Sequence, residues 1–230
     1  MNFETLLSLS RPPLAIGLLA APPSGIAPWQ GAVPAGCSFW SLAMSGRSFY
    51  TAAPDHRNCA IGAHTHGLTA PDGGAALHDT LGFMVSSGYL RMEEVPGIPV
   101  FANPPQYIAY APLESAPFSP DLVLIAAKPS SAMLLYEAAV RAGAAHALTN
   151  ALGRPACAVL PLTLAQQSAT LSFGCKGNRT FTGLPDGELY FCVPGAKWES
   201  VAAALTSIHA ANETMGRHYL QHQSRFPILA

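Results

Sequence analysis

Four of the five cysteines in this chain lie where a predicted helix or strand begins or ends. Helix N-termini and loops leave main-chain N–H groups unpaired, and these groups lower the pKa of a nearby thiol. The thiolate is the form that binds a metal or attacks an electrophile. The four candidates are Cys37, Cys59, Cys157 and Cys175. The fifth, Cys192, lies inside the apolar run Leu189 to Val193, which predicts a small buried residue outside any site.

Four thiolates can hold one zinc ion tetrahedrally, or each can bind one iron of a 4Fe–4S cluster. Structural zinc sites usually draw their ligands from close pairs in the sequence, and the four candidate cysteines form no such pair. The spacing therefore favours an iron–sulfur cluster or a catalytic metal over a zinc knuckle. Two alternatives stay open, because free cysteines are often ordinary buried thiols and because one of them could act as a nucleophile.

A second group of chemically active side chains surrounds Cys59. Asp55-His56, Cys59, His64 and His66 fall within twelve residues. Imidazole beside thiolate suits zinc, haem, or a nucleophile pair in which the histidine accepts the thiol proton. On a strand, His64 and His66 would point the same way. We therefore include His64 and His66 among the candidate metal ligands, with solvated loop histidines as the alternative.

Two cations flank Cys175 in a glycine-bearing segment that follows a predicted strand. Lys176 and Arg179 could hold a phosphate or carboxylate of a ligand, helped by the free N–H groups of a turn. The competing interpretation is a β-hairpin turn with solvated charges. We keep Lys176 and Arg179 as candidate cofactor-binding residues because Cys175 adjoins them.

The elements that must position these side chains are short. Apolar runs bounded by Pro or Gly predict buried strands at 14–20, 107–110, 122–127, 170–173 and 189–193. Helices are expected at 37–44, 75–86, 130–142, 155–167 and from 197 to about 219. The last helix has the clearest apolar face, formed by Trp198, Val201, Leu205, Ile208 and then Asn212 or Met215.

Strands and helices alternate without a strict β-α-β rhythm, so the expected fold is α+β or α/β. No shift in composition marks a domain boundary. We therefore expect a single mixed-sheet globular domain with flanking helices over residues 1–230, in which 218–230 form a flexible tail.

Composition excludes several functional classes. Half of the residues are apolar and 11% are charged, which argues against intrinsic disorder. Twelve basic residues nearly balance thirteen acidic ones, so the basic patch of a nucleic-acid binder is missing. No apolar run reaches the 18 or so residues that span a bilayer, and no signal peptide is recognisable. We expect a soluble cytoplasmic protein with reduced thiols, and the low charge suggests a homo-oligomer.

Several short stretches spread along the chain carry a resemblance to a known family. They are Pro13-Leu14-Ala15-Ile16, Cys37 with Ala43 and Gly46, Asn58-Cys59-Ala60-Ile61-Gly62 leading to Gly67-Leu68, Tyr110-Ala111-Pro112-Leu113, Pro120-Asp121-Leu122-Val123-Leu124, Ala156-Cys157-Ala158 and Gly174-Cys175-Lys176-Gly177-Asn178-Arg179. From about Leu14 to about Leu205 the chain resembles the DUF169 family of uncharacterised prokaryotic proteins. The resemblance implies a cytoplasmic protein with a cysteine at each of the four candidate positions, and no settled activity. The segment His64-Thr65-His66 departs from the family's pattern.

Three functional hypotheses follow. The first is a cysteine-ligated metal centre, with an iron–sulfur cluster ahead of zinc or haem, that serves electron transfer or cofactor handling with a redox partner. The second is a thiol-dependent enzyme in which Cys59, with His64 or His66, acts on a small anionic substrate. The third is an accessory subunit that has no site of its own.

Overall fold

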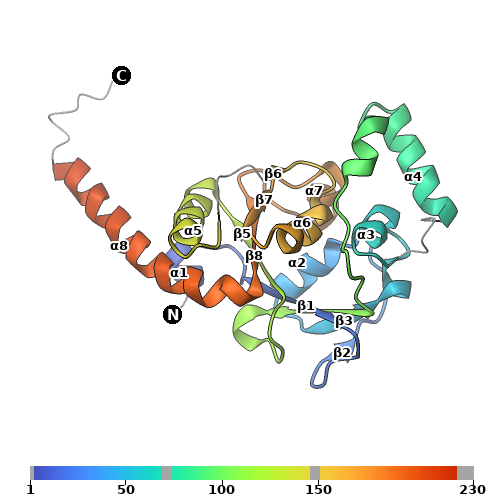
Figure 1. Cartoon of the computed structure of the whole chain (residues 1–230). Helices are drawn as coiled ribbons and strands as arrows, with labels where there is room; N and C mark the ends of the chain where they lie inside the picture. The colour runs from blue at the N-terminus through green and yellow to red at the C-terminus, as the bar shows by residue number, and fades with distance from the viewer. Residues whose placement is uncertain (1–2, 69–73, 146–150, 222–230) are drawn as a thin grey trace.

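The computed structural model describes residues 3–68, 74–145 and 151–221, and the strands of these residues form one mixed sheet (Figure 1). Across the sheet the order is β2-β3-β4-β1-β5-β8-β7-β6, with two parallel pairs, β2 with β3 and β6 with β7. The strands are β1 (Leu14–Leu19), β2 (Ala27–Pro28), β3 (Phe49–Ala52), β4 (Tyr107–Pro112), β5 (Leu122–Ala127), β6 (Ala151–Leu152), β7 (Thr170–Ser172) and β8 (Leu189–Pro194). With helices on both faces, this is an α+β fold.

The central strands are buried on both faces of the sheet. In β5, Leu122 and Leu124 belong to one apolar core, whereas Val123 and Ile125 belong to the other. Successive side chains of a strand point to opposite faces, so a strand covered on both sides must be apolar at every position. This requirement explains the uninterrupted apolar run at 122–127.

Helices from different parts of the chain cover the two faces. One face carries α2 (Ser38–Met44), α3 (Ala60–Thr65), α4 (Gly74–Ser86), α6 (Val159–Gln166) and α7 (Lys176–Thr182). The other carries α1 (Phe3–Leu7), α5 (Pro129–Arg141) and α8 (Trp198–Gln221). The four candidate cysteines all lie on the first side, where short helices and loops leave room for a site.

Helix α8 packs on the sheet with its first half only. Its predicted apolar face is confirmed as far as Ile208, and Met215 is 47% exposed. The second half runs away from the body of the fold (Figure 1). Residues 218–221, predicted as part of a tail, are therefore helical, and residues 222–230 lie outside the described residues.

Most predicted elements are confirmed, and the differences fall on short ones. The predicted helix at 155–167 is divided into a 3-10 turn, η4 (Ala156–Ala158), followed by α6. Sequence patterns missed the strands β2, β3 and β6 and the helices α1, α3 and α7. Within the described part of the chain, no helix combines the length and the apolar character that crossing a bilayer requires.

Candidate functional site

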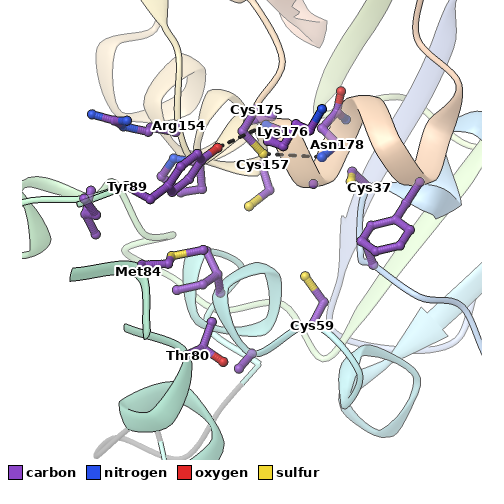
Figure 2. A pocket seen from close by; sticks show the side chains of 18 of the residues that line it. Cys37, Cys59, Thr80, Met84, Tyr89, Arg154, Cys157, Cys175, Lys176 and Asn178 are labelled. Atoms are coloured by element: carbon purple, nitrogen blue, oxygen red, sulfur yellow. Dashed lines mark hydrogen bonds between the residues drawn. The ribbon is translucent and has the colours of Figure 1, made fainter. Parts of the chain in front are cut away.

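A cavity of about 430 Å³ opens between α3, α4, α7 and η4, and all four candidate cysteines line it. In Figure 2 the sulfur atoms of Cys37, Cys59, Cys157 and Cys175 point toward one common space. The rest of the lining is mostly apolar and includes Ile61, Phe83, Met84, Leu90, Ile98 and Phe181. We call this space the cysteine cavity. The fold thus joins two cysteines from the first third of the chain to two that follow 98 residues later (157 minus 59).

Each cysteine stands at the start of a helix. Cys37, Cys59 and Cys175 immediately precede α2, α3 and α7, and Cys157 lies in η4 just ahead of α6. The positive ends of four helical segments are therefore gathered around one cavity. Of the four sulfur atoms, that of Cys175 accepts a main-chain N–H of its helix, from Asn178.

Close packing brings the loops of Cys37 and Cys59 together. A side chain at Gly62 would place its Cβ 2.9 Å from the Cys59 Sγ and 3.7 Å from the Cα of Gly36. The Asn58 amide also donates a hydrogen bond to the carbonyl of Val33 at 3.1 Å. Glycine at position 62 is thus what lets the Cys59 sulfur lie against the first turn of α3.

Asn178 interacts with both Cys175 and Cys37. Its main-chain N–H donates to the Cys175 Sγ at 3.4 Å, and its buried side chain offsets part of the rise that burial causes in the pKa of Cys37. The same side-chain amide donates to the Tyr190 hydroxyl at 3.4 Å. Asn178 therefore interacts with sulfur atoms that come from α2 and α7.

Burial keeps the deeper thiols protonated. Desolvation, together with the negative charge that Cys59 and Cys175 would carry, raises the pKa of Cys37 to about 12. Desolvation also raises the pKa of Cys157 well above its ordinary value, with the same repulsion from the other three cysteines. Without a bound cation, Cys37 and Cys157 are neutral thiols at neutral pH.

The candidate histidines do not line the cysteine cavity. Residues 60–65 form α3, not the strand that would align His64 with His66. His66 is fully buried with both ring nitrogens unpaired, and its ring stacks on Phe101 with centroids 5.6 Å apart. Among the residues that the structure describes, no hydrogen bond joins a cysteine sulfur to an imidazole, so the expected thiol–imidazole pair is not assembled.

The segment with Lys176 and Arg179 is a helix start, not the predicted turn, because Cys175 caps α7. The Arg179 guanidinium donates to the carbonyls of Phe173, Pro185 and Glu188 at 2.6 to 2.9 Å. These bonds give Arg179 a structural role in fixing the chain around α7. The Lys176 side chain is exposed at the rim of the cysteine cavity.

Cys192 is a core residue, as its apolar surroundings in the sequence predict. It lies in the middle of β8 with no exposed surface. Burial raises its pKa to about 12. The structure thus separates Cys192 from the cysteines of the cavity.

Sequence reasoning missed several residues that line the cavity, among them Tyr89, Arg154 and Asn178. Arg154 lies three residues before Cys157, and Asn178 three residues after Cys175. The second spacing is a detectable signal, since a helix-capping side chain usually accepts the N–H of the third residue. No comparable signal marks Tyr89, which the fold alone brings to the site.

In the described part of the chain, no three Cys, His, Asp or Glu side chains are gathered closely enough to hold a single metal ion. Comparison with known proteins finds no match among curated proteins and none among solved structures. The sequence model of DUF169, described as "Uncharacterised ArCR", matches residues 2–204. The chain therefore belongs to the DUF169 family.

Proposed function

We propose that this DUF169 protein holds a cysteine-ligated iron–sulfur centre through Cys37, Cys59, Cys157 and Cys175, and that the centre serves electron transfer or cofactor handling. The observation that carries the proposal is that four cysteines from distant parts of the chain line one cavity. The fifth cysteine is buried in a strand outside that cavity.

The arrangement of the thiols suits a cluster better than one metal ion. A single zinc ion needs all four sulfur atoms within about 2.3 Å of the same point. In a 4Fe–4S cluster each thiolate binds a different iron, so the sulfur atoms stand farther apart around the cluster. Side chains that line a shared cavity, without closing on one point, fit the second requirement.

The electrostatics support an anionic centre. Four helical segments begin at or beside the cysteines, and helix N-termini favour negative charge close to them. The lining is mostly apolar, and charge interactions are stronger in apolar surroundings than in water. When bound, an iron–sulfur cluster supplies one-electron chemistry, and this chain's residues would hold it and set its surroundings.

Binding of the cluster must release protons, because Cys37 and Cys157 are neutral thiols in the protein without it. Metal binding to cysteine requires the thiolate, so affinity rises with pH. Burial raises the pKa of both thiols and so extends this dependence to higher pH. The amide of Asn178 opposes the shift at Cys37.

The proposal is tested by purifying the full chain without oxygen and measuring iron and acid-labile sulfide. We expect about four iron and four sulfide ions per chain, and a broad absorption band at about 400 nm. A protein that stays colourless and free of iron and sulfide, even after anaerobic reconstitution, would contradict the cluster. Binding of one zinc ion per chain in its place would give the centre a structural role.

A thiol-dependent enzyme that acts on a small anionic substrate is the second candidate. The observation that favours it is Cys175, which is half-buried, accepts an N–H from α7 and adjoins Lys176. This candidate predicts that metal-free protein reacts with iodoacetamide first at Cys175. Equal labelling of Cys59 and Cys175 would contradict this candidate, which requires Cys175 to be the more reactive thiol.

A further inference from the structure

A second cavity of about 670 Å³ adjoins the cysteine cavity, and we call it the outer cavity. The two share a rim of residues that line both spaces. These residues are Tyr89, Leu90, Ile98, Arg154, Cys175 and Lys176. A molecule that enters the cysteine cavity from the outer cavity must therefore pass two cations and Cys175.

The charge of this shared rim is positive. Arg154 and Lys176 line both cavities, and Glu94 is the acidic residue that lines the outer one. Glu94 accepts the main-chain N–H of Arg91 at 2.7 Å and lies 3.5 Å from the guanidinium of Arg91. It lies 4.0 Å from the Arg154 guanidinium, so it neutralises Arg154 only in part.

Tyr89 contacts both residues that carry these cations. Its hydroxyl accepts the main-chain N–H of Lys176 at 3.0 Å. Its ring lies under the Arg154 guanidinium, 5.1 Å from the centroid. Figure 2 shows the three residues together at one edge of the cavity, with Met84 below them. Two cations at one rim can bind one anionic group between them.

Behind the rim the lining changes from charged to apolar. Phe83, Met84 and Ile98 face the cysteine cavity. Phe83 is 73% exposed, an unusual degree for a phenylalanine that borders a cavity. A ligand that fits this gradient has an anionic head and an apolar body.

We propose that the shared rim is a binding site for a small organic anion, in which Arg154 and Lys176 bind the head group and the body lies against Phe83 and Met84. The head group is a carboxylate or a phosphate, since a fork of donors and an ammonium group recognise both. The site uses no cysteine as a ligand to the anion. Its test can therefore be separated from the test of the cluster.

The test is calorimetric titration of the full chain, as purified without oxygen, at low ionic strength. The probes are hexanoate and hexyl phosphate, with hexanol and acetate as controls that lack the charge or the body. We expect at least one of the two anions to bind, and both controls to bind at least tenfold more weakly. Binding of neither anion, or of hexanol as tightly as the better anion, would overturn the proposal.

Variants assign the binding to the rim. Arg154→Gln and Lys176→Gln should each weaken binding of the better anion about tenfold, the scale of one lost charge-assisted contact. Arg154→Lys should retain most of it. Arg217→Gln, on the exposed end of α8, is the matched control and should change it less than twofold. Equal affinities in Arg154→Gln, Lys176→Gln and Arg217→Gln would refute the assignment.

Repeating the titration on metal-free protein separates this site from the proposed centre. Anion binding that persists without metal supports the rim site even if the cluster assay fails. Iron and sulfide contents that stay unchanged in Arg154→Gln and Lys176→Gln support the same separation. Loss of iron in both variants would contradict the independent roles argued above.

Discussion

His66 makes the stability of the metal-free protein sensitive to mild acid. Burial, together with the nearby His56, lowers its pKa to about 3. The main chain of Cys157 acts in the opposite direction, but the two groups do not reach hydrogen-bond geometry. Burial also lowers the pKa of His56, to about 4. Both rings are therefore neutral in the folded protein throughout the range from pH 7 to pH 5.

Stability falls as the pH falls, because the unfolded chain takes up protons that the folded chain does not. An exposed histidine binds a proton below pH 6.5, whereas these two stay neutral when folded. Each therefore contributes stability that is fully present above pH 6.5 and is lost as the pH falls toward the folded pKa. Between pH 6.5 and pH 5 the loss is roughly 1.6 kcal/mol per histidine, because an exposed histidine is only half protonated at pH 6.5 and the full slope of about 1.4 kcal/mol per pH unit is reached below it. For the two histidines together, the folded protein loses about 3 kcal/mol of stability.

The perturbation is His66→Leu, which removes one of the two titrating rings. We expect the loss of stability between pH 6.5 and pH 5 to fall by about half, to roughly 1.6 kcal/mol. At pH 7 the change should be small, because the substitution also removes two unpaired buried nitrogens. The measurement is urea unfolding of the metal-free protein at several pH values. Carboxylates contribute little in this range because most of them titrate below pH 5.

Ile61→Val is the matched control, a buried residue of α3 that does not titrate. It should lower stability by about 1 kcal/mol at every pH and leave the pH dependence unchanged. An identical pH dependence in His66→Leu and in the wild-type chain would refute the reasoning. It would mean that His66 is protonated or hydrogen-bonded in the folded protein.

Three shorter predictions concern the cysteines. Cys192→Ser places a hydroxyl in the apolar core, which should cost about 1 to 3 kcal/mol in thermal unfolding without changing iron content; equal iron loss in Cys157→Ser and Cys192→Ser would contradict this. Gly62→Ala puts a Cβ 2.9 Å from the Cys59 Sγ and should reduce iron content, whereas Gly82→Ala, which meets no atom within 4 Å, should not. Stripping the metal should lower the melting temperature by several degrees, which corresponds to a loss of about 1 to 3 kcal/mol of unfolding free energy. A second Cys→Ser change in the cavity should add little to the first, and additive losses would argue against one shared centre.

The sequence predicted the long buried elements well because burial on one or both faces leaves a recognisable pattern of apolar residues. β5 matches its predicted bounds, 122–127, since both of its faces must be apolar. β3 was missed because four residues, Phe49–Ala52, are too few to establish a period. α3 and α7 were missed because each contains a glycine, Gly62 and Gly177, in a segment that also suits a turn.

The site was predictable in its residue types but not in its assembly. Helix starts at Cys37 and Cys157 could be inferred from local patterns, and these led to the four candidate cysteines. Spacing alone could not show that they share a cavity, because the order of strands in the sheet decides which loops meet. Arg154 escaped notice for the same reason, since its partner Tyr89 lies 65 residues away (154 minus 89).

Native mass spectrometry under anaerobic conditions tests the central claim most directly. The reconstituted wild-type chain should carry the added mass of one 4Fe–4S cluster, and so should Cys192→Ser. Single Ser variants at Cys37, Cys59, Cys157 and Cys175 should each lose that mass or hold it weakly. Four cavity variants that retain the cluster as firmly as Cys192→Ser, or a wild-type chain that binds none, would contradict the claim that these cysteines form one metal centre.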